Sequence, residues 1–480
     1  MQTQQYINGQ WVDGAADAIE SYNPATGEVI ANVASANEAQ VNEAVAAARS
    51  ALAGEWANLL PVQRAEVLFK IADLIEANAE EFAQLETLDQ GQPIGVARQV
   101  SVAGAANHFR YFAGFVTKIQ GTTNPVSFPD TLHYTKREPV GVNALITPWN
   151  FPLMILAWKL APALATGNTV VIKPSEVTPL TSIKLVEICE QAGVPAGVVN
   201  IVTGAGNVGA LLSSHMDVDH LSYTGSTPTG KAITHAAADS NLKRLTLELG
   251  GKAPSIITSS ADIDAAVAGN VGGALLNSGQ VCAAYTRFYV DSKVHDEFVE
   301  KLAGAASSMN VGPGADENSQ LTPVVSEKHL GHVTNLIEAG RSEGAELVTG
   351  GKRIDRDGFF VEPTVFTGVS DENTIAKEEI FGPVLSVMQY EGQDGLDEVI
   401  ARANDTEYGL AAAVWTKDIA ESQKIANGLR SGAVFVNMLP IPDMAAPWGG
   451  YKQSGWGREM GPQAIECYTE TKAVWLHYGS

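Results

Sequence analysis

Gly141-Val142-Asn143-Ala144-Leu145-Ile146-Thr147-Pro148-Trp149-Asn150-Phe151-Pro152 is the stretch from which the fold can be predicted. Residues 141–147 form an apolar run of strand length, and the run stops at a turn rich in proline and aromatic residues. Continuous apolar runs of this length are typical of strands buried on both faces of a parallel sheet. The stretch therefore predicts a strand of an α/β domain.

The rhythm of strand, turn and helix repeats after this stretch. Strands are predicted at 168–173, 198–203, 220–224 and 244–249, with helices at 179–192, 208–214 and up to about residue 238. A second series has predicted strands at 254–258, 287–291, 346–348, 384–389, 411–415 and 432–437, and helices at 262–276, 294–308, 326–342, 395–403 and 418–429. Such alternation implies a doubly wound parallel sheet whose ligands bind at the carboxyl ends of the strands.

The remaining segments surround these two series. Residues 6–33 are predicted to form short strands, with a hairpin signal at Asn8-Gly9, and residues 38–107 show helical spacing of apolar residues. Residues 131–138 are polar and β-like, and 468–478 are predicted to form a closing strand. We expect 131–138 to form an arm outside the main core.

The composition excludes several classes of protein. The 480 residues suffice for about three domains. A net charge of −23 disfavours nucleic acid and membrane surfaces as partners, because both are anionic. No signal peptide and no apolar run of membrane-spanning length is present. Three cysteines are too few and too scattered for a disulfide framework or a metal site, which suits a reducing cytoplasm.

One cysteine stands in a setting suited to chemistry. Cys282 follows Ser278-Gly279-Gln280-Val281, and the residues Ala283 and Ala284 after it are small. A lone cysteine after a helix-breaking glycine is poised to attack a carbonyl carbon. The alternative is a buried structural cysteine, which is a common environment for a free thiol.

A carboxylate and an amide could assist such a thiol. Glu248 ends an apolar strand in front of Gly250-Gly251, and a carboxylate in apolar surroundings has a raised pKa and can act as a general base. Asn150, held between aromatic residues and prolines, could stabilise an oxyanion. The alternatives are a salt bridge from Glu248 to a distant cation and an ordinary turn asparagine.

Three stretches could bind a nucleotide. Residues 204–209 match the three-glycine dinucleotide fingerprint, although a turn that needs glycine would look the same. Ser226 could cap a helix that faces a phosphate, with Gly225 allowing close approach. Glu176, just after Lys173, could bind ribose hydroxyls and would repel a 2′-phosphate. Alternatively, Lys173 and Glu176 are ordinary surface charges.

In this order the motifs resemble those of the aldehyde dehydrogenase superfamily, from about residue 6 to 478. The matching stretches are Pro148-Trp149-Asn150-Phe151-Pro152, Lys173-Pro174-Ser175-Glu176, Thr224-Gly225-Ser226-Thr227, Glu248-Leu249-Gly250-Gly251-Lys252, Gly279-Gln280-Val281-Cys282, Glu379-Ile380-Phe381-Gly382-Pro383 and Gly449-Gly450-Tyr451-Lys452-Gln453-Ser454-Gly455. The resemblance implies a Rossmann-like NAD-binding domain (1–118 and 141–250), a catalytic α/β domain (251–453), a connecting segment (454–467) and a β arm (119–140 and 468–480). The arm would pair subunits into homodimers or homotetramers.

The resemblance also implies roles for single residues. Cys282 would be the nucleophile, Glu248 the base that activates water, and Asn150 with the Cys282 backbone N–H the oxyanion hole. Lys159 and Glu459 match a pair proposed as a proton relay. The implied NAD-binding residues are Thr147, Pro148, Trp149, Lys173, Ser175, Glu176, Gly206, Gly209, Gly225, Ser226, Leu249, Gly250, Glu379 and Phe381. The glycine fingerprint then becomes a wall of the adenine pocket.

The reaction and substrate follow as hypotheses. CoA-acylating relatives lack the carboxylate at the position of Glu248, so hydrolysis of a thioester is favoured over transfer to CoA. Retention of Cys282, Glu248 and Asn150 argues against a non-catalytic binding protein. Tunnel positions are matched by Phe151, Ile155, Trp158, Val281, Ala283 and Trp448. These side chains predict an uncharged aromatic or medium-to-long aliphatic aldehyde. NAD is favoured as cofactor, and NADP stays an alternative.

Overall fold

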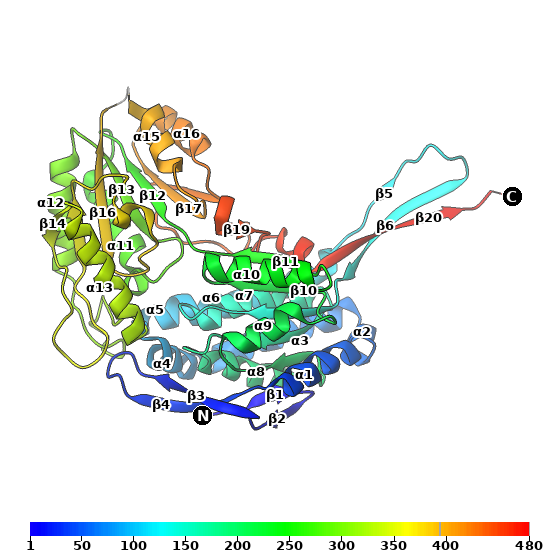
Figure 1. Cartoon of the computed structure of the whole chain (residues 1–480). Helices are drawn as coiled ribbons and strands as arrows, with labels where there is room; N and C mark the ends of the chain where they lie inside the picture. Colours follow the sequence, from blue (N-terminus) through cyan, green and yellow to red (C-terminus); the bar gives the residue numbers. More distant parts are fainter. Residues whose placement is uncertain (393–394, 480) are drawn as a thin grey trace.

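The strand predicted at 141–147 lies in the middle of an eight-stranded sheet in the computed structural model (Figure 1). All five residues of β7 (Val142–Ile146) are buried, and β7 pairs in parallel with β8 (Thr169–Lys173) and β10 (His220–Thr224). The structure describes residues 1–392 and 395–479. Residues 393 and 394 of the predicted catalytic domain and residue 480 of the predicted arm lie outside the described residues.

The first sheet has the strand order β19-β11-β10-β7-β8-β9-β1-β2. Its other strands are β11 (Arg244–Glu248), β9 (Val199–Ile201), β1 (Gln5–Ile7), β2 (Gln10–Val12) and β19 (Gly455–Trp456). The β1–β2 hairpin turns at Asn8 and Gly9, whose φ angles of 51° and 80° are those of a tight hairpin turn. β19 comes from the predicted connecting segment and pairs antiparallel with β11, which the sequence did not reveal.

Helices cover both faces of this sheet and bury its apolar strands. One face is covered by α1 (Glu38–Ala51), α9 (Gly206–Ser214) and α10 (Thr227–Asp239). The other is covered by α3 (Pro61–Ala77), α6 (Ala103–Phe115), α7 (Pro152–Ala165) and α8 (Leu180–Ala192). The same half of the chain also contains the helical segments α2 (Glu55–Asn58), α4 (Ala79–Gln90), α5 (Ile94–Val96), η1 (Ala97–Val102) and η2 (Val116–Lys118). The doubly wound α/β arrangement predicted from the strand rhythm is confirmed.

A second sheet of seven strands forms the other body, with the order β14-β15-β16-β13-β12-β17-β18. The strands are β12 (Ala253–Ile257), β13 (Tyr285–Asp291), β14 (Glu346–Thr349), β15 (Thr364–Thr367), β16 (Val384–Tyr390), β17 (Ala411–Trp415) and β18 (Ala433–Val436). One face packs on α11 (Ile263–Leu275) and α12 (His295–Ser307), the other on α13 (Glu327–Ser342), α14 (Thr374–Lys377), α15 (Leu396–Asn404) and α16 (Ile419–Gly428). The sequence missed β15, a four-residue buried strand directly after Pro363.

The predicted arm projects from the first body as a thin three-stranded ribbon (Figure 1). β20 (Thr469–His477) pairs antiparallel with β6 (Thr131–Pro139) along its whole length, and β5 (Thr123–Asn124) pairs with the other edge of β6. A separate two-stranded sheet, β3 (Ala16–Tyr22) with β4 (Val29–Ser35), lies near the N-terminus. Within the described residues, no helix combines the length and apolarity needed to cross a membrane.

Candidate active site

A cleft of about 810 Å³ opens at the carboxyl ends of the strands of the first sheet. Every residue that the resemblance implied for NAD lines this cleft, together with Asn150, Glu248 and Cys282. The strands bring these residues together because Thr147 follows β7, Lys173 ends β8, and Glu248 ends β11. Parallel strands that end at one edge are the usual ligand-binding position in such sheets.

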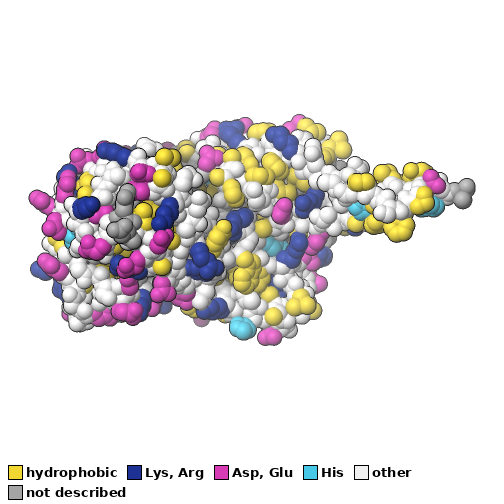
Figure 2. Space-filling view, turned by 90° about the horizontal axis from the view of Figure 1, so that it is seen from above, with side chains coloured by type: hydrophobic (Ala, Val, Ile, Leu, Met, Phe, Trp, Pro, Cys, Tyr) yellow, Lys and Arg dark blue, Asp and Glu magenta, His cyan; other side chains and the backbone are white. Residues whose placement is uncertain are grey.

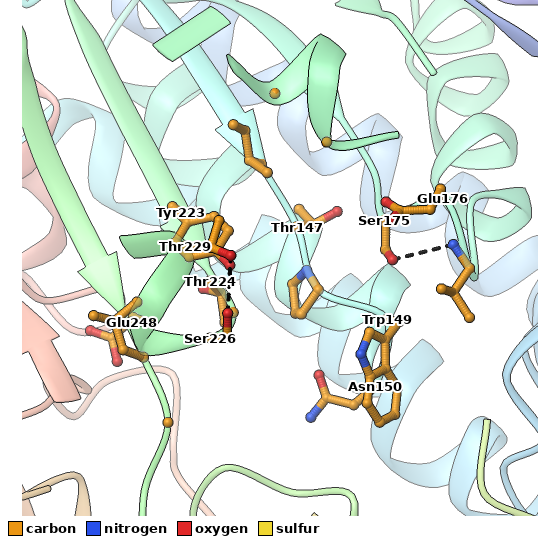
Figure 3. A pocket seen from close by; sticks show the side chains of 18 of the residues that line it. Thr147, Trp149, Asn150, Ser175, Glu176, Tyr223, Thr224, Ser226, Thr229 and Glu248 are labelled. Carbon is orange, nitrogen blue, oxygen red and sulfur yellow. Dashed lines mark hydrogen bonds between the residues drawn. The ribbon is translucent and has the colours of Figure 1, made fainter. Parts of the chain in front are cut away.

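The two ends of the cleft differ in chemistry. Figure 3 shows Ser175 and Glu176 at the upper right of the view, away from Glu248 and Asn150 in its lower part. The Lys173 ammonium is buried and donates to Glu176 Oε2 at 3.1 Å, whereas the Glu176 side chain is 41% exposed. Neither residue is an isolated surface charge. A half-exposed carboxylate oriented by a buried lysine fits the two hydroxyls of a ribose.

The middle of the cleft offers backbone donors. Ser226 occupies the N-cap position of α10, but its hydroxyl donates to Thr229 Oγ1 at 3.0 Å and does not cap the helix (Figure 3). The prediction of side-chain capping is therefore wrong: the hydroxyl is oriented toward the Thr229 side chain and accepts no N–H of the first turn. A Cβ at Gly206 would meet no atom within 4 Å. Uncapped N–H groups and open space beside glycine fit a pyrophosphate and an adenosine.

Glu379 and Phe381 lie where the two bodies of the chain meet at the cleft. Glu379 is half-buried, and its Oε1 accepts a hydrogen bond from Gly251 N at 2.8 Å. Burial raises the pKa of Glu379 to about 7. Phe381 has a left-handed backbone (φ 56°), and its ring meets that of Trp149 at 5.1 Å. A carboxylate beside two aromatic rings fits a ribose with a flat heterocycle.

Glu248 is a buried carboxylate whose oxygens have no hydrogen-bond partner in the part of the chain that the structure describes. Its pKa is raised well above the usual range, first by burial and then by the nearby carboxylate of Glu459, while Lys159 opposes the shift. No salt bridge ties up Glu248 among the described residues. The sequence-based expectation of a carboxylate with a raised pKa agrees with this environment.

The thiol of Cys282 faces the same end of the cleft. Loss of hydration and the carboxylates of Glu379 and Glu248 raise its pKa to about 12, while the N–H groups of Cys282 and Ala283 favour the thiolate. The thiol is therefore protonated at neutral pH and needs a base when it reacts. Asn150 is buried, and its Nδ2 donates to Gln280 O at 2.9 Å, which leaves a second N–H on the same nitrogen.

A buried polar group lies behind Glu248. The Lys159 ammonium forms a short ion pair with Glu459 Oε1 and donates to the hydroxyl of Ser222 at 2.9 Å. The Ser222 hydroxyl donates in turn to the same Glu459 oxygen at 2.8 Å. The structure thus joins the two residues of the predicted relay, and Ser222 is a third member that the sequence did not single out.

The predicted tunnel residues belong to one apolar cluster around the thiol. Phe151, Ile155, Trp158, Ala283 and Trp448 are buried there, and Val281 and Cys282 pack against them. The rings of Trp158 and Trp448 meet at 6.3 Å. None of the six predicted tunnel side chains is charged. Whether it contacts substrate stays a prediction.

Sequence reasoning missed one wall of the cleft. It is formed around the start of α13 by Val325, Ser326, Lys328, His329 and His332. His329 Nε2 bonds to Phe381 O at 2.7 Å, and burial lowers the pKa of His329 to about 4. The imidazole is therefore neutral and fixes the Phe381 backbone. No motif signals this wall, since only folding brings α13 to the cleft.

Known proteins share this architecture and these motifs. The family model described as the aldehyde dehydrogenase family matches residues 11–474. The chain belongs to the aldehyde dehydrogenase family. This confirms the family, the α/β fold class and the enzyme class, an NAD-dependent aldehyde dehydrogenase, that the sequence predicted.

Individual relatives match over nearly the whole chain. The DhaS protein of Bacillus subtilis (strain 168) is 47% identical over 475 residues, which are 98% of this chain and 95% of that protein. The NAD+ complex of the Bacillus cereus aldehyde dehydrogenase superposes with a TM-score of 0.97 at 45% identity, covering 100% of this chain and 97% of that one. The cytosolic 10-formyltetrahydrofolate dehydrogenase of Xenopus tropicalis is 44% identical over 99% of this chain, but the chain spans only 53% of its length.

Proposed function

We propose that the enzyme oxidises an uncharged aldehyde to the carboxylic acid with NAD+, through a thioester on Cys282 that water hydrolyses. The observation that carries the proposal is the convergence of a thiol, an amide donor and an unpartnered carboxylate at one end of the cleft. Hydrolysis is favoured over transfer to CoA because Glu248 is buried, raised in pKa and free to take a proton from water.

The first half of the reaction uses the thiol and the oxyanion donors. Cys282 Sγ attacks the carbonyl carbon, its proton passes to solvent water in the open cleft, and the carbonyl oxygen becomes an oxyanion. Asn150 Nδ2–H and the Cys282 N–H would stabilise that charge, an arrangement worth about 3 kcal/mol for each donor. The adduct then loses a hydride and becomes a thioester; NAD+, when bound, supplies the hydride acceptor.

The second half depends on Glu248. The carboxylate takes a proton from water, the resulting hydroxide attacks the thioester carbon, and the C–S bond breaks to release the product as its carboxylate and Cys282 as the thiol. The proton held by Glu248 must leave a buried site. We propose that Glu459, Lys159 and Ser222, bonded to one another directly behind Glu248, accept and pass on that proton.

The substrate proposal rests on the apolar cluster at Cys282. Aromatic and aliphatic walls stabilise an apolar aldehyde by about 25 cal/mol for each Å² buried, whereas apolar groups do not compensate a carboxylate for its lost hydration. We expect kcat/KM, measured from NADH absorbance with a panel of aldehydes, to be highest for an aromatic or medium-to-long aliphatic aldehyde. A maximum for betaine aldehyde or succinate semialdehyde would refute this substrate class.

We also propose that the arm, made of β5, β6 and β20, pairs two copies of the chain. Hydrophobic side chains lie at several places on its surface (Figure 2), and Phe128, Trp475 and Leu476 are 65%, 55% and 52% exposed. The free edge of β20 and these side chains are typical of a surface that is buried in an oligomer. The assembly would be a homodimer or homotetramer.

The double change Trp475→Ser, Leu476→Ser is expected to shift the enzyme to smaller species in light scattering coupled to gel filtration. The control is Thr471→Ser on the same strand, which removes no large apolar surface. A wild-type enzyme that runs as a monomer, or a double variant with wild-type mass, would contradict the proposed role of the arm. The domain boundaries and a cytoplasmic location stay predictions.

A further inference from the structure

Three consecutive residues in front of the nucleophile have left-handed backbones. Asn277, Ser278 and Gly279 have φ angles of 48°, 57° and 75°, and both non-glycine residues are only 1% exposed. A left-handed conformation costs a non-glycine residue about 1–2 kcal/mol, so it persists where the surroundings impose it. Such strain concentrates at functional sites, and the contacts that impose it here lead to the active site.

The side chain of Asn277 is bonded to the backbone of Asn150. Asn277 Nδ2 donates to Asn150 O at 3.0 Å, and Gln92 Nε2 donates to the same carbonyl oxygen at 2.9 Å. Asn277, Gln92 and Asn150 are all buried. The Asn150 carbonyl is thus held by two amide donors from two separate segments of the chain.

The bonds continue from Asn150 to the nucleophile segment and back. Asn150 Nδ2 donates to Gln280 O at 2.9 Å. Gln280 bonds to Asn277 O through both its backbone N (3.1 Å) and its side-chain Nε2 (3.0 Å). Asn277, Asn150 and Gln280 therefore form a closed ring of hydrogen bonds. The ring contains Asn150, the proposed oxyanion donor, and Gln280, which lies two residues before Cys282.

The other two residues of the turn have different partners. Ser278 Oγ donates to Thr322 O at 2.6 Å and accepts from Thr322 N at 2.9 Å, so it attaches the turn to a neighbouring loop. A Cβ on Gly279 would collide with the carbonyl oxygen of Gly382. Of the three residues, only Asn277 has a side chain that reaches Asn150.

We propose that Asn277 and Gln92 are positioning residues for the oxyanion hole. Their amide N–H groups fix the Asn150 backbone, so that the free N–H of the Asn150 side chain points at the oxygen of the bound aldehyde. Neither residue touches the reacting atoms. The inference rests on the proposed oxidation through Cys282, and it assigns to the strained turn a role beyond the placement of the cysteine.

The variant Asn277→Gly separates this role from strain alone. Glycine adopts a φ of 48° without cost, so the variant relieves the backbone strain while it loses the amide. We expect the rate of the NADH burst to fall about tenfold or more, because a displaced donor stabilises the transition state poorly. If the turn served only to hold strain, Asn277→Gly would react at the wild-type rate.

Gln92→Met provides an independent test, because Gln92 has the same target but lies outside the turn. It should slow the burst in the same way. The double variant should be slower than either single variant, but its loss of rate relative to wild type should be smaller than the product of the two single losses. The matched control is Ser278→Ala, which removes the bonds of the turn to Thr322 and leaves both donors to Asn150 in place. It should lower the melting temperature without slowing the burst.

Two measurements without NAD+ complete the test. Acyl transfer from p-nitrophenyl acetate to Cys282 forms the same oxyanion and should slow in Asn277→Gly and Gln92→Met. Alkylation of Cys282 by iodoacetamide forms no oxyanion and should stay within about threefold of wild type. Equal loss of alkylation and acylation, or no loss of acylation in either variant, would overturn the inference. A wild-type enzyme that forms no NADH with any aldehyde would refute the proposed function, whereas the ester would still test the role of Asn277.

Discussion

Cys282→Ala is expected to lower kcat for aldehyde oxidation by about four orders of magnitude or more, since removal of a nucleophile abolishes the covalent route. Among the described residues that line the cleft, Cys282 is the only cysteine, and its thiol is the strongest nucleophile beside Glu248 and Asn150. Alanine occupies less space than cysteine and adds no charge, so the cleft and its NAD-binding residues are left intact. The measurement is NADH formation with the best aldehyde of the panel.

The chain provides matched controls for this change. Cys189 is buried in α8, where burial raises the pKa of its thiol to about 12, and Cys467 bonds to Arg458 O. Neither residue lines the cleft. Cys189→Ala and Cys467→Ala should therefore retain turnover within a few fold of wild type, and titration of bound NAD+ should show unchanged affinity in Cys282→Ala. Turnover that survives Cys282→Ala would refute the assignment of the nucleophile.

The elements that place this thiol were largely predictable. Buried strands such as β7 and β8 consist of continuous apolar residues, and their ends carry the polar motifs that line the cleft. The boundaries of the predicted strands and those of the structure differ by at most two residues. Short elements were missed where local pattern is weak: β15 has four residues and β19 has two. β15 lies between β14 and β16 in the second sheet, whereas β19 pairs with β11, which is far away in the chain.

Contacts between distant segments could not be read from the chain. Gln92 and Asn150 are 58 positions apart, and Lys159 and Ser222 are 63 apart, yet each pair is joined by one hydrogen bond. A buried amide or hydroxyl leaves no spacing signal, because its partner is chosen by the packing of whole elements. The resemblance supplied the pair Lys159 and Glu459, but Ser222, Asn277 and His329 needed the folded structure.

Glu248→Gln is the second change with a large expected effect. The amide is isosteric with the carboxylate but cannot take a proton from water, so hydrolysis of the thioester should slow by about 10²–10⁴-fold. The steps before the thioester do not need that proton transfer. We expect a burst of NADH equivalent to one turnover for each active site, followed by a steady rate far below that of wild type.

The pH dependence identifies the group responsible. Glu248 must be ionised to act as a base, so hydrolysis of the thioester should rise with pH through its raised pKa and be lost below it. Glu248→Gln should remove this rising limb. Glu459→Gln tests the cause of the raised pKa. The Glu459 carboxylate raises the pKa of Glu248, so its removal should shift the rising limb of the rate to lower pH. A steady rate that matches wild type in Glu248→Gln, or a limb that stays in place in that variant, would show that another group activates the water.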